Sequence, residues 1–111
     1  MRKEARITSN KDFKEVYSQG KSVANKDLVL FFLKKESSRT RIGISVSRKI
    51  GPAVVRNRIR RLIKEAFRRN ETEIKEGYDI VIIARQPIKE KSFHDVEKTS
   101  IDILLRAGLI K

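Results

Sequence analysis

The chain has 111 residues with 27 basic and 14 acidic side chains, a formal net charge of +13. This length suits one domain with one hydrophobic core, and a hydrophobic content of 39% indicates a folded chain rather than a disordered one. With no cysteine and a single histidine, the composition excludes a disulfide framework and a thiolate or multi-histidine metal site. We expect a single domain over residues 1–111, beginning with a basic N-terminal arm at residues 1–8.

No part of the sequence has the pattern of a targeting signal or a membrane span. The basic N-terminus is not followed by the apolar run of an export signal. The longest apolar run, at residues 28–33, is far shorter than the roughly 20 residues needed to cross a bilayer. The sequence therefore predicts a cytoplasmic protein with no membrane partner.

The positive charge is concentrated in about a quarter of the chain. Residues 41–69 hold ten of the 27 basic residues but only one of the 14 acidic residues. Solubility alone would not require this clustering. Nucleic acid is the first candidate partner of a strongly basic protein, ahead of an anionic membrane or an acidic protein.

Three segments have the periodicity and the end signals of helices: residues 9–20, 52–70 and 92–108. The first and the third begin at capping Ser or Asn side chains and end at a glycine. The second begins at Pro52, which suits the first turn of a helix. We expect these three helices to carry most of the regular structure outside the strands.

Two strands are predicted between the first and second helices, and one between the second and third. Residues 26–35 form an apolar run and residues 40–49 alternate in polarity, so we expect these two to pair as a hairpin. A buried strand follows at residues 78–85, and residues 21–25 can add a short one. The order α-β-β(-β)-α-β-α predicts an α+β fold, an α/β sandwich of about three helices on a small, mainly antiparallel sheet.

The middle helix has one apolar side and one basic side. At about 100° per residue, its apolar side chains fall within one arc that would face the core. The opposite side carries what we call the ridge: Asn57, Arg60, Arg61, Lys64 and Arg68. Arg56 flanks the ridge on one edge, and Arg58, Glu65 and Arg69 flank it on the other.

The ridge has two interpretations. Most charge runs are solvated faces, but such faces usually alternate in sign because like charges at helical spacing repel each other. The ridge contains no acid, and only Glu65 beside it can pair locally, with Arg61 or Arg69. Arginine, whose planar fork binds phosphate at two points, predominates over lysine. The sequence therefore favours a phosphate-binding surface.

Residues before the middle helix can extend this surface. Arg48 and Lys49 precede the helix, whose N-terminal amides can donate to a phosphate oxygen. The preceding strand places Gly43, Ser45 and Ser47 on one face. These small residues would let a nucleic-acid backbone lie flat on the sheet, unless another element of the chain covers them.

The aromatic residues have a structural and a functional interpretation. Core packing is the default for each, and especially for Phe32 and Phe67. Phe13 and Tyr17 are four residues apart on the first helix, and Phe31 points to the opposite strand face from Phe32. If the first helix lies along the sheet, Phe13, Tyr17 and Phe31 would line a groove on which unpaired bases stack.

The residues do not form a recognisable catalytic site. The sequence has no credible Ser/His/Asp or Cys/His arrangement and no phosphate-binding GxxxxGK[ST] loop. Asp79, Asp95 and Asp102 lack metal-ligand spacing, and His94 is expected at the surface. The sequence therefore predicts an RNA or DNA binder rather than an independent enzyme.

An ordered set of segments resembles the bacterial ribonuclease P protein subunit family. The segments are DFKEVYSQGKSVAN (12–25), RIGISVSRKIG (41–51), the arginine-rich stretch within SRKIGPAVVRNRIRRLIKEAFR (47–68), and YDIVIIAR (78–85). The resemblance covers nearly the whole chain. It implies the small subunit of a ribonucleoprotein endonuclease that removes the 5′ leader of precursor tRNA by hydrolysis.

The resemblance also implies where each partner binds. The catalytic RNA would bind the helix with the RNR motif and its neighbours: Arg48, Lys49, Arg56, Asn57, Arg58, Arg60, Arg61, Lys64 and Arg68. The single-stranded leader would bind a cleft between the first helix and the sheet, with Phe13, Tyr17 and Phe31 at its aromatic positions and Ser45 and Ser47 on its floor. A left-handed crossover around the RNR helix is implied too, against the usual right-handed rule.

The mechanism implied by this resemblance is electrostatic and positional. Basic side chains would screen the repulsion between two polyanions, while the cleft aligns the scissile phosphate with Mg²⁺ ions held by the RNA. The protein itself is then expected to hold no metal or cofactor, no catalytic residue and no small-molecule substrate. Two other classes stay open: a basic ribosomal or DNA-binding protein, which would not need the cleft, and a nuclease active without RNA.

Overall fold

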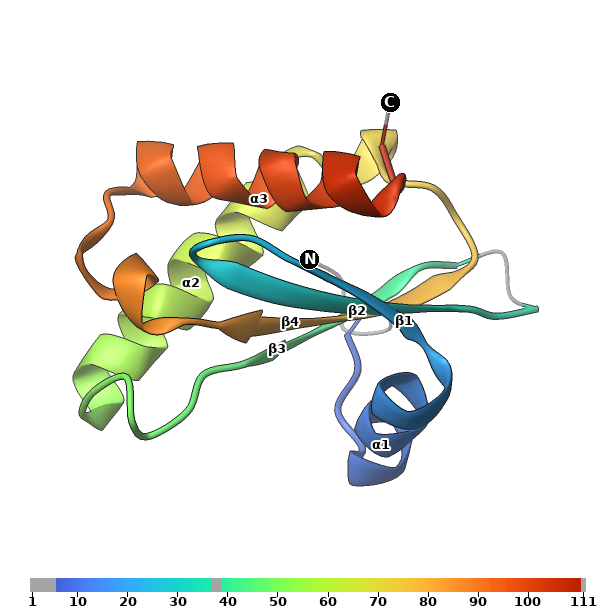
Figure 1. The fold of residues 1–111 in the computed structure, drawn as a ribbon, viewed down its shortest axis with the longest axis horizontal. Helices are drawn as coiled ribbons and strands as arrows, with labels where there is room; N and C mark the ends of the chain where they lie inside the picture. Colours follow the sequence, from blue (N-terminus) through green and yellow to red (C-terminus); the bar gives the residue numbers. More distant parts are fainter. Residues whose placement is uncertain (1–5, 37–38, 111) are drawn as a thin grey trace.

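The structure, a computed structural model, describes residues 6–36 and 39–110 (Figure 1). The described helices and strands are α1 (Asn10–Gln19), β1 (Lys21–Ala24), β2 (Leu28–Lys34), β3 (Arg41–Ser45), α2 (Ala53–Arg69), β4 (Tyr78–Ala84) and α3 (Phe93–Ala107), with short 3-10 turns η2 (Glu71–Glu73) and η3 (Gln86–Glu90). Among them no helix is both long and apolar enough to cross a membrane. The α+β class and the element order predicted above are confirmed.

The strands form one mixed sheet in the order β1-β2-β4-β3. β2 pairs antiparallel with β1 and with β4, and β3 pairs parallel with β4. The predicted hairpin between residues 26–35 and 40–49 is therefore wrong, because β4 lies between β2 and β3. The hairpin partner of β2 is β1, the short strand that the sequence suggested at residues 21–25.

The pattern of burial explains why β4 takes the central place. Its residues Ile80, Val81 and Ile82 are all fully buried, so both of its faces are covered. A strand that is apolar on both faces belongs inside a sheet, whereas alternation suits a less protected position. β3 and β4 are parallel neighbours joined through α2, which is the crossover that the family resemblance describes as left-handed; its hand stays a prediction.

The helix ends follow the predicted signals. Ser9 caps α1 by accepting a hydrogen bond from the Asp12 amide at 3.1 Å, and Ser92 caps α3 in the same way. Gly108 ends α3 in the left-handed conformation, with φ at 73°. Because L-residues with a side chain rarely adopt this conformation, glycine suits this end.

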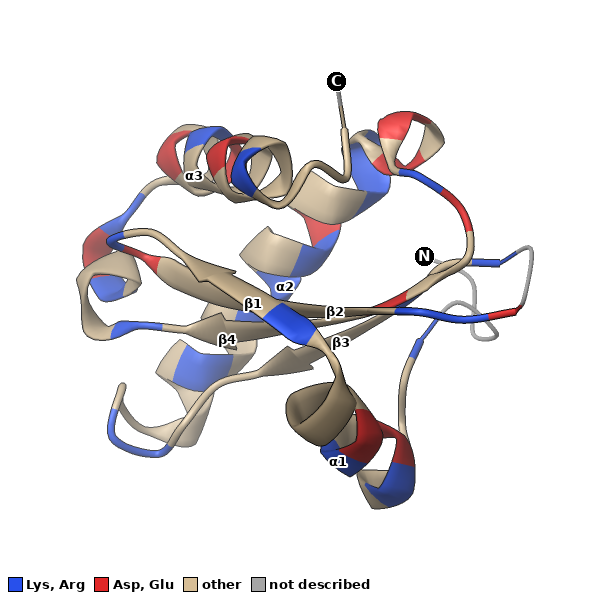
Figure 2. Cartoon of the chain, turned by 45° about the vertical axis from the view of Figure 1, so that its right-hand side comes forward, with Lys and Arg blue, Asp and Glu red and all other residues tan. Residues whose placement is uncertain are grey.

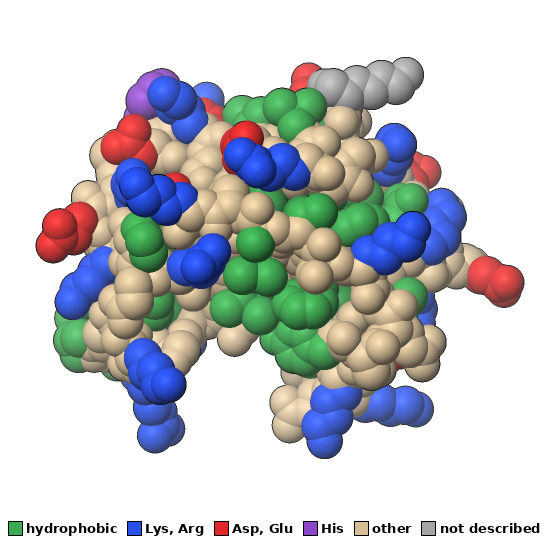
Figure 3. Space-filling model, in the orientation of Figure 1, with side chains coloured by type: hydrophobic (Ala, Val, Ile, Leu, Met, Phe, Trp, Pro, Cys, Tyr) green, Lys and Arg blue, Asp and Glu red, His purple; other side chains and the backbone are tan. Residues whose placement is uncertain are grey.

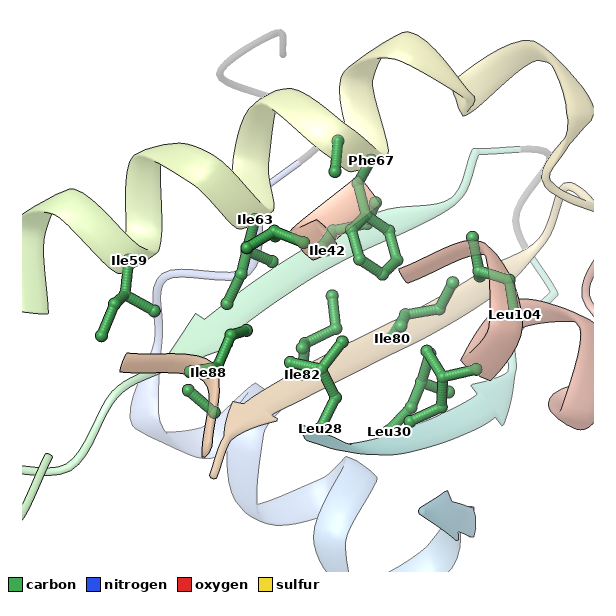
Figure 4. Packing of buried hydrophobic residues seen from close by; sticks show 14 of the residues in the cluster. Leu28, Leu30, Ile42, Ile59, Ile63, Phe67, Ile80, Ile82, Ile88 and Leu104 are labelled. Carbon is green, nitrogen blue, oxygen red and sulfur yellow. The ribbon is translucent and has the colours of Figure 1, made fainter. Parts of the chain in front are cut away.

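Helices cover the two faces of the sheet unequally. α2 and α3 lie across one face, and the shorter α1 lies on the other (Figure 1). The larger core is formed between the sheet and the two longer helices, where Phe67, Ile80 and Leu104 are fully buried (Figure 4). A smaller core on the α1 face contains Ile7 and Val16 against the sheet.

The packing of α1 on the sheet includes two positions where only glycine fits, and the N-terminal segment packs on the same face. A side chain at Gly20 would lie 2.5 Å from the Val16 carbonyl oxygen, and one at Gly43 would lie 2.7 Å from the Phe13 ring. Ile7 is buried and donates its amide to the Ile42 carbonyl oxygen at 3.0 Å. Residues 1–5 of the predicted basic arm lie outside the described residues, but residues 6–8 pack on the sheet and are not a free arm.

Ion pairs tie α1 to the strands beneath it. Arg41 on β3 donates two hydrogen bonds to Asp79 on β4, at 3.0 and 2.7 Å, and a third to Asp12 on α1 at 3.2 Å. Hydrogen bonding from Ser9 and, after it, Arg41 lowers the pKa of Asp12, so this contribution to folding is lost as the pH falls through the folded value. Lys35 adds a second link to α1 through Glu15.

Replacing Arg41 with alanine should destabilise the fold, because the Asp79 side chain is 2% exposed and would become an uncompensated buried charge. We expect a loss of about 3 kcal/mol in the free energy of unfolding, measured by urea denaturation. Arg106→Ala is the matched control, since its ion pair with Asp102 is exposed and should be worth less than about 1 kcal/mol. Equal losses in the two variants would contradict the role assigned to Arg41.

Candidate nucleic-acid interface

The two edges of α2 face different parts of the molecule. On one edge, Arg58 donates to the Lys91 carbonyl oxygen at 3.2 Å, and Arg69 lies 3.5 Å from a Glu97 carboxylate oxygen. Those contacts join α2 to α3 and to the segment before it. The other edge, which carries Arg60 and Lys64, faces β3 and the N-terminal segment. Figure 2 shows basic residues, in blue, recurring along the whole length of α2.

A cavity that we call the basic pocket lies between α2, β3 and the N-terminal segment. Its volume is about 210 Å³, and its lining residues are Arg6, Ile7, Thr8, Ile42, Gly43, Ile44, Arg60, Arg61 and Lys64. Four of the nine are cations and none is an acid. With apolar and cationic residues in its lining, the pocket suits an anionic group that carries its own apolar part, as a nucleotide does.

A second hollow, which we call the groove, lies between α1 and the sheet. Its volume is about 420 Å³, and it is lined by Asn10, Phe13, Lys14, Tyr17, Ile44, Ser45, Val46 and Arg60. It too has cations and no acid in its lining. Figure 3 shows a notch at the lower edge of the molecule between the α1 region and the start of α2. Because Arg60 lines both the groove and the basic pocket, the two hollows are adjacent and share one guanidinium.

Three aromatic rings in and behind the groove contact one another in turn. The Phe13 and Tyr17 ring centroids lie 6.3 Å apart, and the Tyr17 and Phe31 rings meet edge to face at 5.1 Å. Phe31 is not a lining residue and supports Tyr17 from the strand. Tyr17 is 37% exposed, and partial burial raises the pKa of its hydroxyl, an effect that the neighbouring Ser45 hydroxyl reduces. Tyr17 therefore offers a neutral, accessible ring at neutral pH.

The small residues of β3 divide between the two interpretations left open by the sequence. Gly43 is buried beneath Phe13 of α1, and it lines the basic pocket but not the groove. Ser45 lines the groove and is open to a ligand. Ser47 lies beyond β3, where its hydroxyl accepts the Lys49 amide at 3.1 Å, and it does not line the groove. Of the two predicted floor residues, the structure thus places only Ser45 there.

The ridge residues differ in their internal partners. Asn57 accepts a hydrogen bond from Arg60 at 2.8 Å, and Arg68 binds both carboxylate oxygens of Glu65 at 2.7 and 2.6 Å. The sequence suggested that Glu65 pairs with Arg61 or Arg69. In the structure it pairs with Arg68 instead. Within the part of the chain that the structure describes, the Arg61 and Lys64 side chains make no hydrogen bond or ion pair.

The remaining predicted RNA-binding residues cluster near the start of α2. Arg56 donates to the Gly51 carbonyl oxygen at 3.1 Å, which holds it against the helix start. Arg48 and Lys49 lie exposed in the turn that leads into α2. Pro52 occupies the N-cap position of α2, so the helix start has no capping side chain, and its first turn has no acidic residue. Its N-terminal amides therefore add to the positive potential of the two basic side chains.

Sequence reasoning missed several lining residues. Asn10 and Lys14 belong to the groove, and they lie on the same helical stripe as Phe13 and Tyr17, so extending that stripe by one turn would have identified them. Arg6 and Thr8 line the basic pocket because the N-terminal segment forms a bridge between Arg6 and Ile42 on β3. Nothing in the local sequence signals that pairing.

Comparison with known proteins identifies the family. The family model described as Ribonuclease P matches residues 1–108. The chain belongs to the ribonuclease P protein family. The ribonuclease P protein component of Clostridioides difficile strain 630 is 49% identical over 104 residues, covering 93% of this chain and 91% of that protein. The component from Clostridium botulinum strain Loch Maree is 45% identical over 108 residues, covering 96% and 97%.

Solved structures agree with this membership in the ribonuclease P family. The structure of the Staphylococcus aureus RNase P protein superposes with a TM-score of 0.90 at 38% identity, covering 96% of this chain and 98% of that chain. Membership in the ribonuclease P protein family implies a role in ribonuclease P and in tRNA processing, with an RNA partner.

Replacing Arg61 and Lys64, the two ridge cations without a partner among the described residues, should lower both the affinity for RNA and the dependence of that affinity on salt. We expect Arg61→Ala/Lys64→Ala to reduce the slope of log affinity against log salt concentration by about 1.4 to 1.8, if each cation contacts one phosphate. Filter binding of ribonuclease P RNA across a salt series measures this slope. Lys75→Ala/Lys89→Ala removes the same charge at other exposed positions. An equal change in that control would mean that net charge alone is responsible.

Proposed function

We propose that this protein is the RNA-binding subunit of ribonuclease P, which assists a catalytic RNA in removing the 5′ leader of precursor tRNA. In this proposal the ridge and the start of α2 contact the catalytic RNA. The groove holds the single-stranded leader. The protein acts in the cytoplasm, as part of a ribonucleoprotein.

The observation that carries the proposal is the position of Arg60. This side chain belongs to the ridge, yet it also lines both the basic pocket and the groove. A strand lying in the groove would therefore pass directly beside the surface proposed for the catalytic RNA. Two polyanions can approach each other closely only where cations separate them, and the linings of both hollows supply cations without an opposing acid.

The chemistry of the groove supports an unpaired strand as its ligand. Tyr17 offers an accessible ring, Phe13 packs beside it, and Lys14 and Arg60 can meet phosphates. Stacking on an aromatic face accepts any base, so such a groove holds leaders of varied sequence. A duplex would not present its bases for this contact, which is why a leader fits better than the tRNA body.

We place the catalytic groups and the Mg²⁺ ions of the reaction on the RNA. The groove and the basic pocket have no acidic lining residue that would hold a divalent cation beside the bound strand. The contribution of the protein is then positional: it lowers repulsion and fixes the leader, so that the scissile phosphate meets metal held by the RNA. On its own the protein is not expected to cleave.

The test is a cleavage assay on precursor tRNA at low Mg²⁺ concentration. The reaction is run with a bacterial ribonuclease P RNA alone, with this protein alone, and with both. We expect efficient cleavage in the mixture only, and its loss when Arg60 and Arg61 are both changed to glutamate, because the reversed charges repel RNA. Lys75→Glu/Lys89→Glu, with the same charge change elsewhere, should retain activity.

Two results would contradict this proposal. Cleavage by the protein alone would make it a nuclease in its own right. A mixture no more active than the RNA alone would remove its role in this reaction. The charge-matched variant serves the Arg60 and Arg61 reversal, where it separates a loss of activity from a general effect of net charge.

Tyr17→Ala should weaken the binding of precursor tRNA selectively. Loss of one stacked base costs about 1 to 3 kcal/mol, so we expect roughly 5- to 150-fold weaker binding of the holoenzyme to precursor tRNA. Mature tRNA without a leader should bind unchanged, and Tyr17→Phe should retain the wild-type affinity. Affinities from equilibrium binding with leaders of graded length would measure this. An equal loss for mature tRNA would place Tyr17 outside the leader site.

A further inference from the structure

A third hollow lies on the other side of the sheet from α1, under α3. The turn between β1 and β2 forms one wall and α3 forms the other, and Figure 1 shows this turn just below the first part of α3. The hollow has a volume of about 360 Å³. Its lining residues are Asn25, Lys26, Asp27, Lys91, Asp95, Lys98, Thr99, Asp102 and Arg106. It shares no residue with the groove or the basic pocket.

Hydrogen bonds fix the walls of this hollow. The Asn25 side-chain amide donates to the Thr99 carbonyl and hydroxyl oxygens at 3.1 and 3.0 Å, and to Asp102 at 3.0 Å. Its carbonyl oxygen accepts the amides of Asp27 and Leu28 at 3.0 and 2.8 Å. One asparagine thus holds the turn in shape and joins it to α3, so the hollow is formed before any ligand binds.

Asp27 is the unusual residue of this site. It is 7% exposed, yet its carboxylate accepts no hydrogen bond from the described residues, and its Oδ1 atom is fully buried. Buried carboxylates are normally paired, because an unpaired one loses its hydration without compensation. The other two acids differ, since Asp95 is exposed and Asp102 is bound by Asn25 and Arg106. Oδ1 is closed to a ligand, so a ligand can supply a donor to this carboxylate only at its other oxygen, Oδ2.

Cations surround this carboxylate. Within the described residues, no hydrogen bond or ion pair is made by the side chains of Lys26, Lys91 and Lys98. Arg106 donates one hydrogen bond, from its Nε atom, to Asp102. The hollow thus combines a buried acceptor with unpaired positive charge at its rim. A ligand that fits must carry N–H donors at one end and a negative charge at the other.

We propose that this hollow binds an unpaired guanosine nucleotide of RNA, with the guanine edge on Asp27 and the phosphate on Lys26, Lys91 and Lys98. Guanine presents its N1–H and its 2-amino group side by side, and both can point at the one carboxylate oxygen of Asp27, Oδ2, that is open to a ligand. Adenine places an acceptor, N1, at the corresponding position and would be repelled. The identification of the ligand as RNA rests on the proposed function.

A metal ion fits this site less well. No group of three or more His, Asp or Glu side chains within the described residues is arranged to hold a metal ion. Three lysines and an arginine at the rim would also repel a divalent cation. The nucleotide satisfies both the carboxylate and the lysines, whereas a metal ion would satisfy the carboxylate alone.

The test is nuclear magnetic resonance titration of the ¹⁵N-labelled full chain with guanosine 5′-monophosphate. We expect the amide signals of Lys26, Asp27, Lys98 and Thr99 to shift, and adenosine 5′-monophosphate to bind this site about tenfold more weakly. Asp27→Asn should remove that preference without lowering the thermal midpoint, because it relieves an unpaired buried charge. Glu71→Gln, an equal charge change at an exposed residue, should leave binding unchanged.

Three results would overturn the proposal: equal binding of the two nucleotides, undiminished guanine preference in Asp27→Asn, or the same shifts produced by Mg²⁺ alone. If Asp27→Asn does not fold, Lys26→Ala/Lys98→Ala decides, since both residues are exposed and their loss should weaken nucleotide binding at least about tenfold. Unchanged binding in that variant would also overturn it. None of these outcomes bears on the cleavage assay, so failure here is distinguishable from failure of the proposed function.

Discussion

The groove exists because Arg41 connects three elements that are distant in sequence. Its guanidinium binds the nearly buried Asp79 on β4 and reaches Asp12 on α1, while its backbone belongs to β3. α1 is only ten residues long and buries one residue fully, so packing alone fixes it weakly. The ion pairs set its distance from β3, and that distance sets the width of the groove between them. Stability and ligand geometry thus depend on the same side chain.

α2 has two roles: one side of it completes the core, and the other side presents positive charge. Its fully buried residues, Ile59, Ile63, Ala66 and Phe67, face the sheet and α3. The repulsion among its arginines is relieved at one edge, where Arg58 and Arg69 bind groups around α3. The opposite edge is left without acids, beside the groove. The helix therefore concentrates its unpaired charge on the side where the two hollows lie.

The sequence predicted elements well and their pairing poorly. Helix ends depend on local signals, such as Ser9, Ser92 and Gly108, and these were found in place. Strand order depends on contacts between distant segments. The run Tyr78–Ala84 is apolar on both faces, which is the sign of a central strand, but the short connection between β2 and β3 favoured a hairpin. The same limit hid Arg6, whose place in the basic pocket depends on a bridge to β3.

The three hollows differ in their acidic residues, and this difference determines which part of an RNA each can bind. The groove and the basic pocket lack acids, so they can attract phosphates and stack bases but have no carboxylate acceptor to distinguish one base edge from another. The hollow under α3 contains the buried carboxylate of Asp27, which can accept from some bases and repels others. Since phosphate contacts position an RNA and base contacts specify it, a protein with both kinds of site can bind varied leaders while contacting a defined nucleotide elsewhere. The groove lies beside α1 and the third hollow lies under α3, across the sheet from α1, so one RNA can occupy the groove without displacing another from the hollow.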